Sequence, residues 1–291
     1  MFDLKGKYDK PDIEKRPEDK SRTAIFFELL LRKFWDLCKV NLLYFVTSIP
    51  AFLIVALLMG IFSSGITEYL TPAITNAVTL FTDVELAVEI AKTDMMIRCM
   101  FTLWFVVLFG TGPSSAGVAY ILRNYAREEH AFIASDWWKH TRSNFRQAFI
   151  VWLIDIFVVF GICIALVFYS AQGSVIWIIS VVVGYAAVVY TLLRMYLYQV
   201  MITFKCSISQ LFRNCFTLMM QETPKALLLL LITVAIHVIV PLVGIAVGFN
   251  EWFWFFFVVA EIVFLPSSTM FMTNYFIYPK IEKYIKINKQ E

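Results

Sequence analysis

Three ionisable residues, Asp155, His237 and Glu261, stand inside long apolar stretches of this 291-residue chain. A titratable side chain is costly in hydrocarbon, so within an apolar stretch it marks a proton relay, a ligand site or an internal pair. Imidazole exchanges protons near neutral pH, and a neighbouring carboxylate can share that proton. These residues are therefore the candidate intramembrane polar site, and the chemistry they indicate is proton exchange or solute binding.

The spacing of His237 and Glu261 about a predicted turn places the two side chains at matching depth. The turn centres on Asn250, which follows His237 by 13 residues and precedes Glu261 by 11. In an antiparallel hairpin these offsets nearly cancel, so we expect the two to form a hydrogen bond close to the membrane midplane. One interpretation is a proton-coupled or substrate-binding pair. The other is a structural bond between two helices.

Asp155 lies closer to the end of its apolar stretch than the other two residues do. It is about six residues inside, which corresponds to roughly 9 Å at the helical rise per residue. Its expected partner is Arg194 or a serine or threonine hydroxyl. This shallow position favours a structural pair or a water-accessible group, and a functional role is the alternative.

The elements that must position these residues are membrane-spanning helices. Hydrophobic residues make up 60% of the chain, charged residues only 16%, and the mean hydropathy is +0.72. Soluble domains are about 45–50% apolar and about 25% charged. The apolar residues fall in blocks of about twenty, the length that crosses the hydrocarbon core. We therefore predict an all-α polytopic membrane protein of six spans, at about residues 41–63, 99–122, 148–170, 175–193, 226–248 and 252–275.

Basic residues are concentrated on one face of this predicted topology. Of the 25 Lys and Arg residues, 22 precede the odd-numbered spans or follow the last one; Lys92 falls in an outer loop, and Arg98 and Arg194 lie at span ends. This positive-inside asymmetry predicts that both termini lie on the cytoplasmic side of the plasma membrane. The expected organisation has three parts. Residues 1–22 form a charged, disordered cytoplasmic arm, residues 23–279 form the membrane domain with an acidic outer loop at 64–97, and residues 280–291 form a basic cytoplasmic tail.

Amphipathic segments precede the first, third and fifth predicted spans, at Thr23–Lys39, Arg123–Gln147 and Arg194–Lys225. Aromatic residues alternate with cations in each segment, as in helices that lie in the membrane interface. We therefore predict three units, each an interfacial helix followed by a two-span hairpin. The basic side chains are expected to bind anionic headgroups, and docking of a protein partner is the alternative. The expected interfacial anchors are Trp35, Trp137, Trp138 and Arg142.

A glycine-rich break interrupts the second predicted span, with Gly110, Gly112, Pro113 and Gly117 as its helix-breaking or small residues. Pro113 removes a backbone donor, and the two serines that follow can bond the freed carbonyls. Small residues also allow a neighbouring helix to approach closely, which is the interpretation we favour. A broken helix that exposes backbone dipoles to a solute, as in some transporters, is the alternative.

The sequence contains no motif of a common catalytic site. No Walker A loop, HExxH or dinucleotide-binding pattern is present. The five cysteines form no CxxC pair and are expected to be buried apolar residues. A serine hydrolase built from Ser114 or Ser115 with His237 lacks a GxSG motif, and a serine beside a helix-breaking proline has a simpler explanation. We expect a protein that is not an enzyme and holds no cofactor or metal; its net charge of +3 gives no indication of nucleic-acid binding.

Several motifs, in their order along the chain, resemble the YesL-like family of bacterial integral membrane proteins, a family without an established biochemical role. They are Phe34-Trp35-Asp36 with Asn41-Leu-Leu, Gly112-Pro113-x3-Gly117 with Arg123-Asn-Tyr, the run from Trp138 to Asn144-Phe-Arg-Gln-Ala, and Leu265-Pro-Ser-Ser with Tyr278-Pro279. The acidic loop and the charged arm depart from the family pattern. The resemblance implies an accessory or regulatory component of carbohydrate transport or utilisation, working with a membrane transporter subunit. A small-solute transporter or channel that uses His237 and Glu261 is the alternative function.

Overall fold

The computed structural model describes residues 20–50, 53, 112–171 and 177–288, and these residues form helices without any strand. The expected all-α fold is therefore confirmed for the described residues. Most of the predicted arm, the predicted outer loop and much of the first two predicted spans, Gly110 included, lie outside them. The six-span count consequently stays a prediction.

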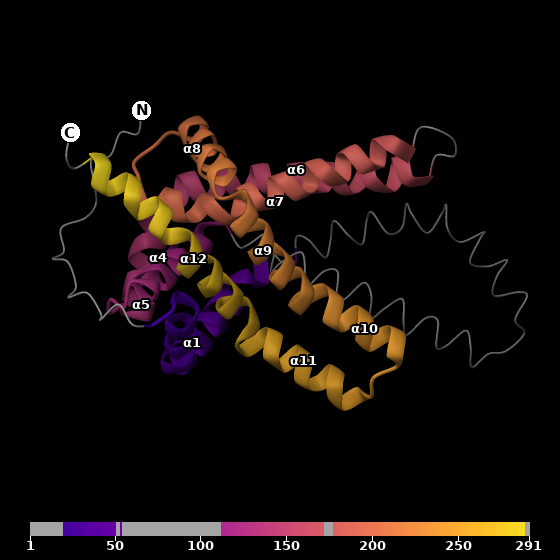
Figure 1. Cartoon of the computed structure of the whole chain (residues 1–291), viewed down its shortest axis with the longest axis horizontal. Coiled ribbons are helices and arrows are strands. Elements are labelled where there is room, and N and C mark those ends of the chain that lie inside the picture. Colours follow the sequence, from indigo (N-terminus) through magenta and orange to yellow (C-terminus); the bar gives the residue numbers. More distant parts are fainter. Residues whose placement is uncertain (1–19, 51–52, 54–111, 172–176, 289–291) are drawn as a thin grey trace, which may run out of the picture.

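The helices follow one another in a series of long hairpins and short connecting elements (Figure 1). Residues 34–50 form a further helix directly after α1. The elements are α1 (Arg22–Arg32), α4 (Pro113–Ala126), α5 (Ile133–Ser143), α6 (Phe145–Ala171), α7 (Trp177–Thr203), α8 (Ile208–Gln221), α9 (Thr223–Val234), the π-helix η2 (Ala235–Ile239), α10 (Val240–Val247), α11 (Glu251–Val263) and α12 (Leu265–Asn288).

Within the described residues, three helices are long and apolar enough to cross a membrane. They lie at Phe145–Leu166, Ile178–Thr203 and Thr223–Gly244. A fourth candidate is the pair α11 and α12, which is bent by 52° at a short break. These four elements overlap the last four predicted spans, and the bounds of those spans stay a prediction.

The fourth predicted span ends later than expected. It was predicted at 175–193, with Arg194 as the start of an interfacial segment, whereas α7 continues without interruption to Thr203. The prediction was wrong because a lone arginine indicates a helix leaving lipid. Here the charge of Arg194 is neutralised inside the protein by Asp155, so the helix can continue past it.

Two further boundaries differ from the prediction. The segment Thr23–Lys39 is two helices, because α1 ends at Arg32 and a new helix starts after the turn at Lys33. The segment expected to start at Arg123 begins later, because α4 continues to Ala126 and Arg123 is only 2% exposed. The short helices before the third and fifth spans are α5 and α8.

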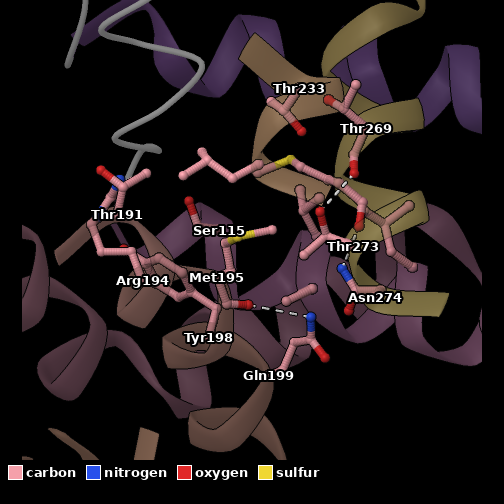
Figure 2. Close-up of a pocket in the computed structure, with 15 residues that line it drawn as sticks. Ser115, Thr191, Arg194, Met195, Tyr198, Gln199, Thr233, Thr269, Thr273 and Asn274 are labelled. Carbon is pink, nitrogen blue, oxygen red and sulfur yellow. Dashed lines mark hydrogen bonds between the residues drawn. The ribbon is translucent and has the colours of Figure 1, made fainter. Parts of the chain in front are cut away.

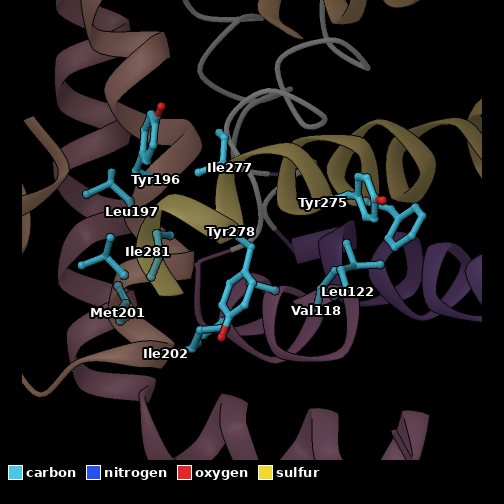
Figure 3. Packing of buried hydrophobic residues seen from close by; sticks show 14 of the residues in the cluster. Val118, Leu122, Tyr196, Leu197, Met201, Ile202, Tyr275, Ile277, Tyr278 and Ile281 are labelled. Atoms are coloured by element: carbon cyan, nitrogen blue, oxygen red, sulfur yellow. The ribbon is translucent and has the colours of Figure 1, made fainter. Parts of the chain in front are cut away.

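The hydrophobic core lies at one end of the molecule, where α4 contacts α5, α6, α7 and α12. Buried side chains of α4, α7 and α12 meet there, among them Leu122, Leu197 and Ile281 (Figure 3). The far halves of the hairpins differ, since they expose large apolar side chains such as Phe157 and Phe256. A surface of this kind is unfavourable in water and suits a lipid environment.

Gly117 allows the closest helix approach in the core region. A Cβ atom added to it would lie 2.6 Å from the backbone oxygen of Trp137 and 2.4 Å from Oγ1 of Thr141, both on α5. No residue larger than glycine fits there without moving α5 away. This contact agrees with the close-packing interpretation of the glycine-rich break.

Candidate functional site

Asp155 on α6 forms a closed ion pair with Arg194 on α7. One nitrogen of the guanidinium, Nη2, lies 2.9 Å from Oδ2 of Asp155, and the hydroxyl of Tyr190 donates to the other carboxylate oxygen at 2.5 Å. Both carboxylate oxygens are therefore engaged, and the Asp155 side chain is only 1% exposed. Of the partners considered from sequence, Arg194 is present; Tyr190 was not anticipated. The cluster holds two opposite charges that cancel.

His237 on the π-helix and Glu261 on α11 form the second cluster. Nδ1 of the imidazole lies 2.8 Å from Oε1 of Glu261, which confirms the contact predicted from the turn spacing. The other ring nitrogen, Nε2, lies 3.2 Å from Oγ1 of Thr269 on α12. Because both ring nitrogens are engaged, the imidazole has no nitrogen left for Ser114 or Ser115.

The π-helix places an irregular turn at His237. Residues 235–239 adopt the wider i→i+5 pattern between α9 and α10. Such single turns are rare and occur frequently at functional sites, because the additional residue rotates side chains away from a regular helical register. The irregularity therefore marks His237 independently of its ionisable ring.

Asn41 holds together the break between α11 and α12. Its Nδ2 donates to the backbone oxygens of Glu261 at 3.0 Å and Ile262 at 2.9 Å, and its Oδ1 accepts from the backbone nitrogen of Ser267 at 2.7 Å. Pro266 causes the break, because a proline in the first helical turn has no N–H for the carbonyl four residues earlier. A side chain from the start of the chain thus satisfies the backbone groups beside Glu261.

A cavity of about 130 Å³ lies between α4, α7, α9 and α12 (Figure 2). Arg194 and Thr269 both line it, and each belongs to one of the two ionisable clusters. Seven further polar side chains and six apolar ones complete the described wall: Ser115, Thr191, Tyr198, Gln199, Thr233, Thr273 and Asn274, with Val118, Ala119, Leu122, Met195, Leu230 and Met270. The structure therefore brings one member of the Asp155 cluster and one partner of the His237–Glu261 pair to the same cavity, a relation that the sequence did not indicate.

The remaining predicted residues lie around this site. Gly112 precedes α4 with a φ of +63°, and Pro113 is the first residue of that helix. The proline thus begins a helix, where its missing N–H costs nothing. The part of the second predicted span before Gly112 lies outside the described residues. Trp138 and Arg142 on α5 are exposed, and Trp35 is 74% exposed. Trp137 is partly buried against Gly117.

Sequence reasoning missed the polar residues that connect the clusters to the cavity. Thr269, Gln199 and Asn274 are uncharged and lie in predicted spans or beside them, so they carry no signal of their own. One signal was available for the break: the pair Leu265-Pro266 stands inside the predicted span 252–275 and indicates an interrupted helix. Among the described residues, no group of three His, Cys, Asp or Glu side chains is placed to hold a metal ion.

Residues 96–169 match a protein family described as "Protein of unknown function, DUF624", a bacterial membrane-associated family. The match covers α4, α5, most of α6 and about a quarter of the chain. It includes Asp155 and excludes Arg194, His237 and Glu261. Comparison with curated proteins and with solved structures found no match. Together with the apolar helices, the family match identifies a membrane protein and gives no activity.

Proposed function

We propose that this protein is a six-span, YesL-like protein of the bacterial plasma membrane that moves a small polar solute through the cavity between α4, α7, α9 and α12. The observation that carries the proposal is the composition of the cavity wall. Arg194 and Thr269 line the same cavity, and they connect it to Asp155 and to His237–Glu261 respectively. Buried ionisable groups beside a cavity that carries polar side chains are typical of solute and proton pathways.

The geometry of Thr269 provides a means to couple solute to protons. If the imidazole of His237 is neutral, Nδ1–H donates to the Glu261 carboxylate and Nε2 accepts from the Thr269 hydroxyl. If the imidazole is protonated, Nε2–H donates to Thr269, whose hydroxyl then donates to the backbone oxygen of Leu265 or Pro266, 3.2 and 3.1 Å away. One proton therefore reverses the direction of a hydroxyl in the cavity wall.

The proposed topology places both termini in the cytoplasm. Arg22, at the start of α1, donates to the backbone oxygen of Tyr275 at 2.7 Å, and Lys280 lies 3.3 Å from Glu222 between α8 and α9. These contacts support a common side for the start of α1, the α8–α9 connection and the end of α12. That side carries most of the basic residues, which fits the positive-inside rule and binding to anionic headgroups through residues such as Arg142.

An accessory role beside a carbohydrate transporter is the other candidate, and it rests on the family resemblance alone. A dry, filled interior with an exposed apolar groove would favour that role. A cavity with several polar side chains, which Arg194 and Thr269 connect to two ionisable clusters, supports movement of a solute instead.

Transport in proteoliposomes tests the proposal. Liposomes that contain a pH-sensitive dye are presented with a panel of small neutral, cationic and anionic solutes. Wild-type protein should take up at least one solute faster than protein-free liposomes and acidify the interior with it, because His237–Glu261 passes the proton. Glu261→Gln should abolish the acidification. Glu251→Gln, a matched change of an exposed residue on the same helix, should leave it intact. Uptake no faster than in protein-free liposomes for any solute contradicts the proposal.

A further inference from the structure

The cavity has two buried carboxamide oxygens without a hydrogen-bond partner. They are Oε1 of Gln199 on α7 and Oδ1 of Asn274 on α12, and the two residues are 2% and 5% exposed. Both line the cavity, where Figure 2 shows them on neighbouring helices. A buried polar atom without a partner is destabilising by about 1–3 kcal/mol in a folded protein. Such atoms are rare in native structures and mark a place where a bound molecule can supply the missing bond.

The orientation of each carboxamide is determined by its own helix. The Nε2 of Gln199 donates to the backbone oxygen of Met195 at 3.4 Å, and the Nδ2 of Asn274 donates to that of Met270 at 2.8 Å. Rotating either amide by half a turn would place two acceptor oxygens face to face. Each oxygen is therefore left without a donor. Because it has almost no accessible surface, a ligand in the cavity reaches it with a donor only when the side chain turns toward the cavity.

Three threonine hydroxyls of the wall use their O–H groups in hydrogen bonds within their own helices. Thr191, Thr233 and Thr273 donate to the backbone oxygens of residues 187, 229 and 269, at 2.8, 2.9 and 3.0 Å. Each hydroxyl oxygen keeps lone pairs that can accept. The polar part of the wall consequently consists mainly of acceptors. Its donors are the hydroxyl of Tyr198 and the second N–H of each carboxamide.

The charge on the wall argues against ionic ligands. Of the described lining residues only Arg194 is charged, and its counter-ion Asp155 is not among them. A cation would meet the guanidinium without a carboxylate in the wall. An anion would face the oxygens of Gln199, Asn274 and the threonines and would have to compete with Asp155 for Arg194. An uncharged ligand that both donates and accepts hydrogen bonds is neither repelled by the guanidinium nor in competition with Asp155.

Resting on the proposed function, we infer that the solute is a small uncharged polyol. Its hydroxyl groups donate to the oxygens of Gln199 and Asn274 and accept from the remaining donors of the wall. The cavity of about 130 Å³ is close to one of about 150 Å³ that accommodates benzene. A ligand of about six non-hydrogen atoms, the size of glycerol, therefore fits.

Glycerol flux into proteoliposomes, followed by light scattering after an osmotic jump, tests the inference. Gln199→Met and Asn274→Leu remove the acceptor oxygens with little change in volume, and each should lower protein-dependent glycerol flux about three- to tenfold. The matched controls are Gln147→Met and Asn144→Leu, whose amides donate to the backbone oxygens of Cys206 and His140 away from the cavity. Both controls should keep wild-type flux.

Three outcomes separate this inference from the proposed function. Uptake of radiolabelled choline or methanesulfonate without glycerol flux overturns the polyol assignment and leaves solute transport standing. Glycerol flux that is equal in the cavity variants and their controls also overturns the assignment, because the oxygens then take no part. Failure of glycerol, choline and methanesulfonate alike to move faster than in protein-free liposomes overturns both proposals.

Discussion

The carboxylates of Asp155 and Glu261 belong to two clusters that reach the same cavity through Arg194 and Thr269, and their partners give them different properties. Asp155 faces the permanent cation of Arg194 and the hydroxyl of Tyr190, so its charge is balanced whatever the state of the surroundings. Glu261 faces an imidazole, whose charge depends on one proton. The comparison shows that a buried carboxylate alone does not identify a functional site. The partner decides whether the cluster is fixed or can switch.

The two clusters also differ in the backbone that carries them. Asp155 and Arg194 lie on the uninterrupted helices α6 and α7, each 27 residues long. His237 lies on a π-turn, and Glu261 lies three residues before the break at Phe264. Irregular backbone inside a membrane protein is tolerated where it lines a cavity or is satisfied by other protein groups. The irregular elements gather around His237 and Glu261, the cluster for which proton transfer is proposed.

The largest expected effect is the loss of the Asp155 charge. Asp155→Asn leaves the guanidinium of Arg194 buried without a counter-ion, and we expect a loss of about 3–5 kcal/mol in the free energy of unfolding. Thermal unfolding of the purified protein in detergent measures it. The double variant Asp155→Asn with Arg194→Gln should recover most of the loss, because no charge then remains buried. A single variant as stable as wild type contradicts the description of this pair as structural.

The same chemical change at the other cluster should have a much smaller effect on stability. In Glu261→Gln the amide oxygen still accepts from Nδ1–H of a neutral His237, so no charge is left without a partner. We expect a loss of about 1 kcal/mol or less, in the range of one altered hydrogen bond. Thermal unfolding under identical conditions checks it. Equal destabilisation by the Asp155 and Glu261 variants means that the two clusters are both structural, and the distinction drawn above is then wrong.

Glu222, a carboxylate outside the predicted spans, should give the smallest change in stability and serves as a reference for the Asp155 and Glu261 variants. A hydrogen bond from Lys225, with a second contact from Lys280, lowers the pKa of Glu222 below its ordinary value of 4.5. A lowered pKa stabilises the folded state fully above pH 4.5, and this stabilisation is lost as the pH falls through the lowered value. Glu222→Gln should therefore cost about 0.2–1 kcal/mol at neutral pH.

The pH dependence of that variant is its test. The melting temperatures of wild type and Glu222→Gln should differ at pH 7 and converge as the pH falls through the lowered pKa, because the carboxylate of the folded protein is then protonated. A difference that is unchanged at the lower pH shows that the glutamine disturbs packing at the α8–α9 connection and that the ion pairs contribute nothing.

The sequence predicted those features that depend on length, apolar periodicity and simple geometry. Four apolar spans and the contact between His237 and Glu261 follow from counting residues along a hairpin, because helical rise is constant. The position of Arg194 was misjudged, since its compensation by Asp155 depends on how two helices face each other. The cavity could not be predicted from the sequence for the same reason, because Gln199, Thr269 and Asn274 line one cavity only after α7 and α12 have packed against α4.

The bonds of Asn41 across the break have a consequence for the order in which the chain is assembled. Asn41 and Glu261 are separated by 220 residues, so the ribosome completes the first of these positions long before the second. Until the last helix pair reaches Asn41, the carbonyl oxygens of Glu261 and Ile262 lack the side-chain amide that donates to them. The last helix pair can therefore complete its hydrogen bonds only if the helix that contains Asn41 is already in place. A chain without its first helices would insert α11 and α12 with unpaired carbonyl groups at the break.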